Sequence, residues 1–361
     1  MQYRRLGKTD LDVSIVGFGA IKLPKVDQDE ATAALNRALD LGVNFVDTAR
    51  AYRDSEEKIG IALESRREEY YLATKTVQRE AEEARAELET SLRNLRTDHV
   101  DLWQLHSVST WEQWEQINAP GGAVEVGAAA LAEGKIRHFG ITIHRDWRVM
   151  RAAIESGLFE TIMVAYSPLD SEGVHEEILP LAQQKDLGVI IMKALSGGQL
   201  ALPAEAKVAG LGGADAVVAG SLRFVLGNPA VSVVIPGITC VREIEEDAAL
   251  AEDFSALSTD ELQELRRLIG GLGQEYRYKQ ACLRCEYCLP CPQGLAIPEI
   301  FRAVHMKTQY PDELKRMGDE LWESLEVYPD ACVECGTCMK KCPAGLNIPE
   351  KLQAAAAVFG Q

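Results

Sequence analysis

The sequence predicts an α/β fold, a (β/α)8 TIM barrel, followed by a small and mainly helical second domain. Eight short apolar runs, rich in β-branched residues, alternate with helical patterns over the first ~250 residues, the size and rhythm of such a barrel. The chain has 361 residues, enough for one large core and a smaller module. Eight of its nine cysteines fall within residues 282–342, which marks the second domain as chemically distinct.

Continuous apolar runs of this length are typical of strands that are buried on both faces of a sheet. The predicted strands cover residues 13–19, 43–49, 70–75, 99–106, 136–142, 162–167, 188–193 and 231–237. The first helical pattern has Asp29 as its expected N-cap and Gly42 at its end. Ser55 and Asp146 are further predicted helix starts. A doubly wound open sheet is the structural alternative.

We expect the barrel to span residues 1–272 and the second domain to span residues 276–361. The second domain contains an internal repeat whose copies begin 50 residues apart, at Cys282 and Cys332. CLRCEYCLPCPQGLAIPEIF matches CVECGTCMKKCPAGLNIPEKL in its three leading cysteines, the Cys-Pro, the following glycine and the Ile-Pro-Glu. Helical sequence fills the gap between the two copies, so this domain should be mainly helical.

The formal net charge is −17, from 38 Lys and Arg against 55 Asp and Glu. So acidic a balance argues against nucleic acid or an anionic membrane as the main partner. No stretch approaches the ~18 uninterrupted apolar residues of a membrane span. The first residues, MQYRRLGKTD, lack the apolar core and small-residue cleavage site of a signal peptide. We therefore expect a soluble, cytoplasmic protein.

Four reactive side chains fall at or just after the ends of successive predicted strands, where a barrel carries its active site. Asp47 follows the second strand and Tyr52 lies on the loop beyond it; Lys75 ends the third strand and His106 the fourth. Singly, they have ordinary explanations: a turn cap, a rim aromatic, a solvated lysine and a hydrogen-bonded core histidine. Together they surround one mouth of the barrel, which a solvated surface does not explain.

These groups suit the delivery of a proton to a carbonyl oxygen while a hydride reaches the carbonyl carbon. Tyrosine, whose pKa lies near ~10, is a poor acid–base catalyst at neutral pH because its phenolate is hard to form. A nearby ammonium, here Lys75, stabilises a phenolate and lowers that pKa. Asp47 would keep the lysine charged and aimed, and His106 would polarise the substrate oxygen.

Residues 1–270 resemble the aldo-keto reductases in strand order and in motif. The matching motifs are FVDTARAY with SEEKIG (45–60), LATK (72–75), LWQLH (102–106) and IPG (235–237). The resemblance implies an NAD(P)H-dependent reductase of a small-molecule carbonyl or alcohol. It also implies a catalytic tetrad formed by Asp47, Tyr52, Lys75 and His106, with Tyr52 as the general acid.

The nicotinamide site that the resemblance implies departs from the family pattern. Thr142 and Ile143 stand where the family usually has Ser-Asn, Met163 replaces a glutamine, and Met192 replaces a stacking aromatic. Thr142 can keep one hydrogen bond, whereas Ile143 and Met163 cannot hold an amide. We therefore expect the nicotinamide to be held differently, by His144, or to bind weakly.

The remainder of the cofactor site follows two later loops. The LSGG turn at 195–198 would let backbone approach a pyrophosphate, although Gly-Gly is also an ordinary turn. The helix that begins near Thr239 offers amide groups to a phosphate. Where the family often has an arginine for a ribose 2′-phosphate, this chain has Glu243, with Asp247 beyond it and Arg242 adjacent, which favours NADH over NADPH. The candidate cofactor-binding residues are Thr142, His144, Met192, Lys193, Leu195, Gly197, Gly237, Thr239, Arg242 and Glu246.

The clustered cysteines have the spacing of iron–sulfur ligands, and thiols this dense in a reducing compartment usually bind metal. The block at 332–342 has the bacterial ferredoxin spacing for a 4Fe-4S cluster; the block at 282–291 is one residue shorter before its last cysteine. In two-cluster ferredoxins the fourth cysteine of each run binds the other cluster. That pattern assigns Cys282, Cys285, Cys288 and Cys342 to one cluster, and Cys332, Cys335, Cys338 and Cys291 to the second. Two zinc sites are the alternative, although zinc typically uses paired C-x2-C units.

The whole chain thus resembles aldo-keto reductases that carry a C-terminal ferredoxin-type domain. The intact tetrad favours a carbonyl reductase whose clusters are structural or redox-sensing. The altered nicotinamide site favours a cluster-linked electron-transfer enzyme, which passes single electrons between the barrel site and a ferredoxin or other redox protein. A flavin usually mediates between nicotinamide and such clusters, and the sequence carries no convincing flavin signature. A non-catalytic iron–sulfur scaffold is a third hypothesis, disfavoured by the tetrad.

Overall fold

The computed structural model describes residues 1–169, 171, 173–198, 200, 214–270, 281–309 and 315–360. The chain divides into two compact units, and each is described by itself. The first unit comprises Met1–Tyr166, Ser171–Ala194 and Leu222–Leu257. The second unit comprises Ser167–Asp170, Leu195–Ser221 and Ser258–Gln361.

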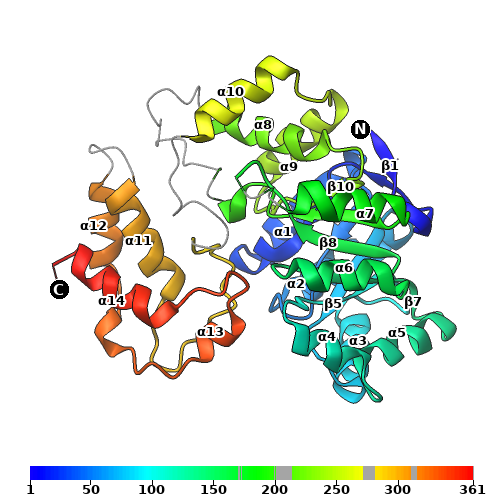
Figure 1. Ribbon diagram of the computed structural model, residues 1–361, viewed down its shortest axis with the longest axis horizontal. Helices are drawn as coiled ribbons and strands as arrows, with labels where there is room; N and C mark the ends of the chain where they lie inside the picture. The colour runs from blue at the N-terminus through cyan, green and yellow to red at the C-terminus, as the bar shows by residue number, and fades with distance from the viewer. Residues whose placement is uncertain are drawn as a thin grey trace. The chain divides into compact units, whose positions relative to one another are not determined.

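Eight parallel strands form the central sheet of the first unit, and helices cover its outer side (Figure 1). Parallel bridges join Val16 to Val234 and Gly19 to Gly237, so the first and last strands meet and the sheet closes. The predicted (β/α)8 barrel is therefore confirmed. In chain order the strands are β3 (Phe18–Gly19), β4 (Phe45–Asp47), β5 (Tyr71–Thr76), β6 (Val100–Leu105), β7 (Ile136–Ile143), β8 (Thr161–Ala165), β9 (Gly188–Met192) and β10 (Val233–Val234).

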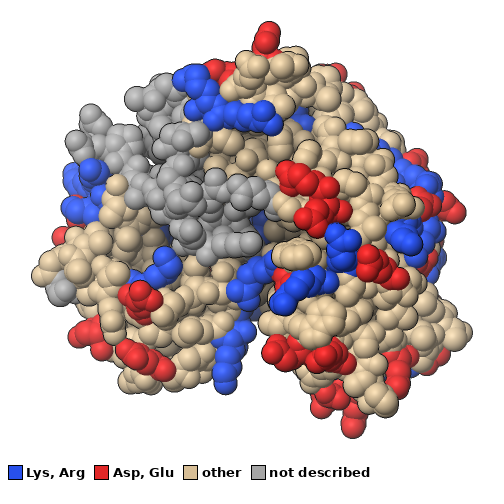
Figure 2. Space-filling view, in the orientation of Figure 1, with Lys and Arg blue, Asp and Glu red and all other residues tan. Residues whose placement is uncertain are grey.

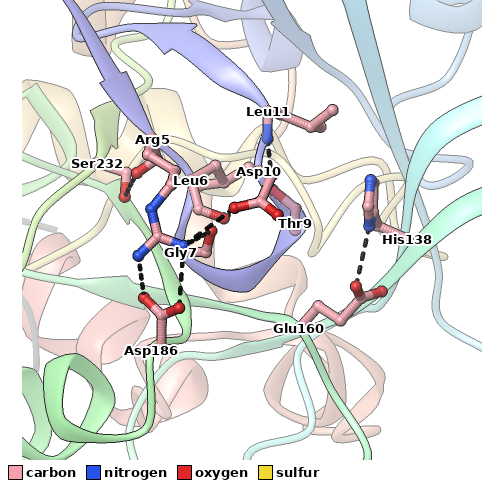
Figure 3. Close-up of polar contacts among 10 residues, drawn as sticks. All are labelled: Arg5, Leu6, Gly7, Thr9, Asp10, Leu11, His138, Glu160, Asp186 and Ser232. Atoms are coloured by element: carbon pink, nitrogen blue, oxygen red, sulfur yellow. Dashed lines mark hydrogen bonds and ion pairs between the residues drawn. The ribbon is translucent and has the colours of Figure 1, made fainter.

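An antiparallel hairpin of β1 (Tyr3–Arg5) and β2 (Asp12–Ser14) precedes the barrel. The predicted first strand, 13–19, is consequently divided between this hairpin and β3. Gly7, in the hairpin turn, has a φ of +51°, and a Cβ there would lie 2.1 Å from the backbone nitrogen of Gly188. Arg5 donates to both carboxylate oxygens of Asp186, at 2.9 and 2.6 Å (Figure 3). The hairpin therefore packs against the N-terminal end of β9, and the opposite end of the barrel is left for a site.

The barrel interior is filled with apolar side chains at the level nearest this hairpin. Met163, on β8, is one of them, with an exposed fraction of 1%, and Met192 packs against the same cluster. The cluster consists of Leu6, Val13, Phe45, Ala73, Leu102, Met163, Ile190, Val233 and Ile235. At this level the barrel interior is therefore a packed core rather than a pore.

The helices that surround the barrel are amphipathic. They are α1 (Gln28–Asp40), α2 (Ser55–Leu63), α3 (Ala81–Asn94), α4 (Trp111–Asn118), α5 (Ala123–Ala132), α6 (Trp147–Ser156), α7 (Leu179–Gln184) and α9 (Val241–Glu252), with α8 (Ala214–Leu226) divided between the two units. Acidic and basic side chains are interspersed on the face drawn in Figure 2. Some form ion pairs between neighbouring helices, such as Arg37 with Glu245 at 2.8 Å. Exposed pairs of this kind contribute only about 0–1 kcal/mol each.

The helix starts were predicted with one error. Asp146 caps α6 as predicted, accepting a hydrogen bond from the backbone of Arg148 at 3.0 Å, and Ser55 is the first residue of α2. The N-cap of α1 is Asp27 rather than Asp29, which lies in the first turn. Asp27 accepts from the Glu30 amide at 2.9 Å while the Glu30 carboxylate accepts from the Asp27 amide at 3.3 Å, a reciprocal capping box.

The second unit is helical in its described cysteine-rich part, as predicted. Its helices are α10 (Thr259–Gly270), α11 (Ile297–Gln309), α12 (Arg316–Glu323), α13 (Thr337–Lys341) and α14 (Ile348–Val358). Trp322 is 4% exposed and stacks on Phe359 with ring centroids 4.1 Å apart, which joins α12 to the end of α14. The predicted boundary between the domains, at 272–276, lies outside the described residues. Within the described part of the chain, no helix is both long and apolar enough to cross a membrane.

Candidate functional site

The four tetrad residues predicted from the sequence all lie at the C-terminal end of the barrel. Asp47 is the last residue of β4 and Lys75 is the penultimate residue of β5. His106 directly follows β6, and Tyr52 lies on the loop between β4 and α2. Since neighbouring parallel strands end at the same edge, the structure brings these four side chains together, as expected.

Lys75 is held between a carboxylate and a phenol. Its ammonium donates to Asp47 Oδ2 and to the backbone oxygen of Thr48, both at 2.6 Å, and it lies 3.4 Å from the hydroxyl of Tyr52. Lys75 is 1% exposed and Asp47 is 2% exposed, so solvent hardly screens the pair. The second carboxylate oxygen of Asp47 accepts from Gln104 Nε2 at 3.3 Å, which orients the carboxylate toward the lysine.

The surroundings of Lys75 keep it charged. Burial alone would lower the pKa of Lys75, but the carboxylate of Asp47 and the adjacent Tyr52 outweigh burial and raise the pKa above its usual range. A cation is therefore fixed next to the Tyr52 hydroxyl, and it would stabilise a phenolate formed there. This arrangement can hand a proton to an oxygen atom and take it back.

His106 is set to act as a neutral donor. Burial, together with the positive charges of Lys75, Arg79 and Lys193, holds the pKa of His106 well below its ordinary value. Its ring meets the ring of Tyr52 edge-on, with centroids 5.7 Å apart. A neutral imidazole carries one N–H, so His106 can donate a hydrogen bond to the same oxygen that receives the proton.

Three further residues support the tetrad and were not singled out from the sequence. Gln104 orients Asp47, and Arg79 donates to the backbone oxygens of His106 and Ser107, at 2.8 and 3.1 Å. Glu56 is fully buried on α2, behind β5. Gln104 lies in the motif LWQLH and Glu56 in the motif SEEKIG, so their place in these motifs is the feature of the sequence that could have identified them.

The candidate nicotinamide residues on β7 and beyond β9 lie beside His106. His144, which directly follows β7, is 4% exposed; its Nδ1 lies 2.6 Å from Lys193 Nζ, and its ring centroid lies 6.2 Å from that of His106. Thr142 Oγ1 accepts from the backbone amide of Ser107 at 2.7 Å, so the hydroxyl retains its proton for a further bond. Polar groups that could hold an amide are therefore present next to the tetrad.

In the loop after β10, a glutamate occupies the backbone amide that was expected to bind a phosphate. The backbone amide and hydroxyl of Thr239 donate to Glu243 Oε2, at 2.6 and 2.9 Å, so the amide expected to meet a phosphate is already bonded. Arg242 pairs with Glu246 at 2.7 Å. Gly237 lies just beyond β10, on the bridge to Gly19.

The turn at 195–198 belongs to the second unit, with the candidate residues Leu195 and Gly197. A Cβ on Gly197, which has a φ of +68°, would lie 2.6 Å from the side chain of Leu283. Arg284 donates to the backbone oxygen of Gly198 at 3.2 Å. This turn therefore packs against the segment that holds the first cysteines.

Two cavities within the second unit are lined by cysteine side chains. One is lined by the first three cysteines of one block and the last of the other: Cys282, Cys285, Cys288 and Cys342. The other is lined by Cys332, Cys335, Cys338 and Cys291, with Cys288 also at its wall. Because Cys288 lines both, the two cavities are neighbours.

The position of the cysteines around each cavity suits a cluster. A 4Fe-4S cluster has one thiolate on each iron, so its ligands stand around a cavity, as these do. Burial raises the pKa of Cys282 to about 12, so a bound iron would have to displace the thiol proton.

Comparison with known proteins identifies both parts of the chain. The aldo/keto reductase family model matches residues 15–208, and the 4Fe-4S dicluster domain model matches residues 279–346. The chain is similar to the uncharacterized oxidoreductase YqkF of Bacillus subtilis (strain 168), with 27% identity over 304 residues, which cover 74% of this chain and 96% of that protein.

Solved structures show the same relationship. An aldo-keto reductase from Bacillus halodurans in its holo form matches with a TM-score of 0.62 and 27% identity, over 77% of this chain and 99% of that one. An aldo-keto reductase from Klebsiella pneumoniae in complex with NADPH matches with a TM-score of 0.59 and 27% identity, over 74% of this chain and 94% of that one. The chain belongs to the aldo-keto reductase family of NAD(P)H-dependent oxidoreductases and carries a C-terminal 4Fe-4S dicluster domain.

Proposed function

We propose that this protein interconverts a small-molecule carbonyl compound and its alcohol, with Tyr52 as the general acid and base. One observation carries the proposal: the buried Lys75–Asp47 ion pair places its ammonium 3.4 Å from the Tyr52 hydroxyl. A lysine buried in this way costs free energy unless it is paired, and here its third neighbour is the phenol.

The bound nicotinamide would supply or accept the hydride. Tyr52 donates its phenolic proton to the carbonyl oxygen, and Lys75 stabilises the phenolate that remains. His106, kept neutral by burial and by neighbouring cations, donates a hydrogen bond to the same oxygen. Asp47 holds the lysine in its charged form throughout, so the proton moves only between Tyr52 and the substrate oxygen.

For the cofactor, we propose NADH, with Thr142 and His144 at the nicotinamide end. The loop after β10 would face a ribose 2′-phosphate with Glu243, whose negative charge would repel that phosphate. Arg242 is already paired with Glu246. Burial, and to a lesser extent Glu243 and Glu246, raises the pKa of Asp247 to about 7, so Asp247 would add only part of a negative charge at neutral pH.

In the second unit we propose two 4Fe-4S clusters, in a reducing compartment such as the cytoplasm. Cys282, Cys285, Cys288 and Cys342 would hold one, and Cys332, Cys335, Cys338 and Cys291 the other. The two cysteine-lined cavities support these sets, because each contains the fourth cysteine of the opposite block.

The test is a Tyr52→Phe variant, purified without oxygen and loaded with iron and sulfide. NADH- and NADPH-dependent reduction is measured on a panel of small aldehydes and ketones, including methylglyoxal and 4-nitrobenzaldehyde. The variant should lose at least ~100-fold in kcat, since the proton donor is gone. Its nicotinamide affinity, measured by fluorescence quenching, should stay unchanged. Full carbonyl reduction by Tyr52→Phe would exclude this function.

A second function is favoured by the shared wall of the two cavities. Because Cys288 lines both, two clusters bound there would be close enough to exchange single electrons. The clusters would then link the barrel site to a ferredoxin or another redox protein. Bleaching of the visible cluster absorption by NADH, with dithionite as the control for full reduction, would support this function. If NADH does not bleach the clusters, only the carbonyl reductase function is supported.

A further inference from the structure

We propose that Glu56 is a positioning residue that acts through Arg50 to fix the distance between Tyr52 and Lys75. The inference rests on the proposed function of Tyr52 as general acid. Glu56 lies behind the strand that carries Lys75, so it acts through its neighbours rather than on the substrate. Three hydrogen-bonding contacts carry the argument: one is to the residue that precedes Lys75, and another is to Arg50, two residues before Tyr52.

Glu56 is the second residue of α2, and none of its side chain is exposed. Its Oε1 accepts from the hydroxyl of Thr74 at 2.7 Å. Its Oε2 accepts from the guanidinium of Arg50 and from Asn94 Nδ2, the latter at 3.3 Å. A carboxylate buried this completely is tolerated only because three donors surround it. The site is therefore rigid, and the donors are held as firmly as the carboxylate is.

The first of these donors fixes the strand under Lys75. Thr74 immediately precedes Lys75 on β5, and side chains alternate between the two faces of a strand. Lys75 points to the barrel interior, where it meets Asp47, so Thr74 points outward to Glu56. The backbone amide of Arg50 also donates to the backbone oxygen of Lys75, at 3.0 Å. Strand and loop are thus joined at Lys75.

The second donor fixes the turn that carries Tyr52. The guanidinium of Arg50 donates to the backbone oxygen of Arg53 at 3.4 Å, and so reaches across the turn. Within the turn, the Tyr52 amide donates to the backbone oxygen of Ala49 at 2.9 Å. Arg53 has a φ of +50°, a left-handed conformation that a residue other than glycine keeps only when its surroundings enforce it. Arg50, anchored by its ion pair with Glu56, contributes to holding Arg53 in this conformation through its hydrogen bond to the Arg53 oxygen.

The contact between Lys75 and Tyr52 would be lost if the distance between them increased only slightly. Lys75 Nζ and the Tyr52 hydroxyl are 3.4 Å apart, already at the long end for a hydrogen bond. If Glu56 loses its charge, Arg50 is released and the turn is free to relax away from Lys75. The phenolate of Tyr52 then loses part of its stabilisation, while the substrate and cofactor contacts stay in place.

The test compares Glu56→Gln with a matched control, Asp101→Asn. Asp101 is also buried, with 1% exposed, and accepts from two arginines and one amide: Arg67 at 2.7 Å, Arg137 at 2.8 Å and the Leu72 amide at 2.9 Å. It lies near the start of β6, whereas His106 follows the end of that strand. Both variants remove one buried negative charge, but only Glu56 contacts the Tyr52 turn through Arg50.

We expect both variants to lower the melting temperature. Glu56→Gln alone should lower kcat by roughly 3- to 10-fold, with KM and the nicotinamide Kd within about twofold of wild type. The fall of the reduction rate at alkaline pH, which reports loss of the Tyr52 proton, should move upward by about half a pH unit, because a more distant cation stabilises the phenolate less. Asp101→Asn should leave that limb in place.

The same kcat and pH profile for Glu56→Gln and Asp101→Asn would overturn the proposal. If Glu56→Gln does not fold, the double variant Arg50→Met/Glu56→Gln serves instead, since it removes both charges of the pair and leaves no buried carboxylate without a partner. The double variant must show the same shift of the alkaline limb, and an unmoved limb refutes the inference. Tyr52→Phe distinguishes a failure of the proposed function from a failure of the positioning role. If Tyr52→Phe is inactive while Glu56→Gln behaves like Asp101→Asn, Tyr52 is still the general acid and only the positioning role of Glu56 is refuted.

Discussion

Replacing Lys75 by methionine tests the electrostatic centre of the site. The variant keeps most of the volume of the buried side chain and removes its charge. At 3.4 Å, and with an effective dielectric constant near 20, the attraction between Lys75 and a Tyr52 phenolate is about 5 kcal/mol. The carboxylate of Asp47 opposes this attraction. Since Lys75 Nζ lies 2.6 Å from Asp47 Oδ2 and 3.4 Å from the Tyr52 oxygen, the two oxygens are at most about 6 Å apart, and they repel each other by at least about 3 kcal/mol.

The net stabilisation of the phenolate by the ion pair is therefore at most about 2 kcal/mol, or about 1.5 pH units. In Lys75→Met the carboxyl group of Asp47, buried without its counterion, will take up a proton, so both terms vanish together. We expect the alkaline limb of the reduction rate to move upward, by up to about 1.5 pH units. Oxidation of the alcohol, which needs the phenolate, should slow by up to about 30-fold at neutral pH.

The assay is the pH dependence of both reaction directions at saturating cofactor. Arg67→Met is the matched control, because Arg67 is 13% exposed and pairs with a buried carboxylate, Asp101, away from the tetrad. Adding Asp47→Asn to Lys75→Met should change little further, since the carboxylate is already neutral. The reasoning is refuted if Lys75→Met leaves the alkaline limb where it is in the wild type.

Two further outcomes are expected. Replacing Cys332, Cys335 and Cys338 together by serine should halve the iron content. A further Cys342→Ser change should remove the remaining iron, because Cys342 lines the remaining cavity. A further Cys291→Ser change should leave that iron in place. Iron and sulfide analysis checks this, and the reverse pattern contradicts the crossed assignment. Glu243→Gln should raise the preference for NADPH over NADH by roughly tenfold, since it removes one charge facing a 2′-phosphate; Kd measurements for both cofactors decide it, and an unchanged ratio shows that the 2′-phosphate lies elsewhere.

The strands of the barrel could be predicted because both faces of each strand are buried, which produces continuous apolar runs. The limits of the first strand could not. Residues 13–14 and 18–19 belong to one apolar run, yet the former pair with β1 in an antiparallel hairpin and the latter with β4 in the barrel. Burial makes both stretches apolar whichever partner they have, so the pattern does not distinguish them.

The sequence contains the feature that distinguishes the true N-cap of α1, Asp27, from the predicted one, Asp29. Asp27 and Asp29 are both acceptable caps by residue type. Only Asp27 has a glutamate three residues later, Glu30, and that spacing allows the two side chains to satisfy each other's backbone amides. Capping is decided by such a pair rather than by one residue.

In the site, residue type and strand position predicted which four side chains would meet. They did not predict what holds those side chains in place. Glu56 and Gln104 are polar residues in a motif, and nothing in their identity says that each is fully buried. Burial depends on which helix lies behind which strand, and for Glu56 that is the packing of α2 against β5. Positioning residues are therefore harder to predict than the residues they position.

The division of the chain separates the two candidate functions. The hydrogen bonds that join Lys75 to Asp47 and Tyr52, and Gln104 to Asp47, lie within the first unit, while every cysteine of the two blocks lies in the second. Proton transfer between Tyr52 and a carbonyl oxygen consequently requires no thiolate. A hydride carries two electrons together, whereas a 4Fe-4S cluster exchanges one at a time, so direct exchange between them is unfavourable without a mediator. A carbonyl reductase should therefore keep its NADH-dependent turnover when all eight cysteines are replaced and the barrel remains folded. A cluster-linked enzyme should lose its turnover in the same variant. Because the two functions predict opposite results, the variant without the eight cysteines decides between them.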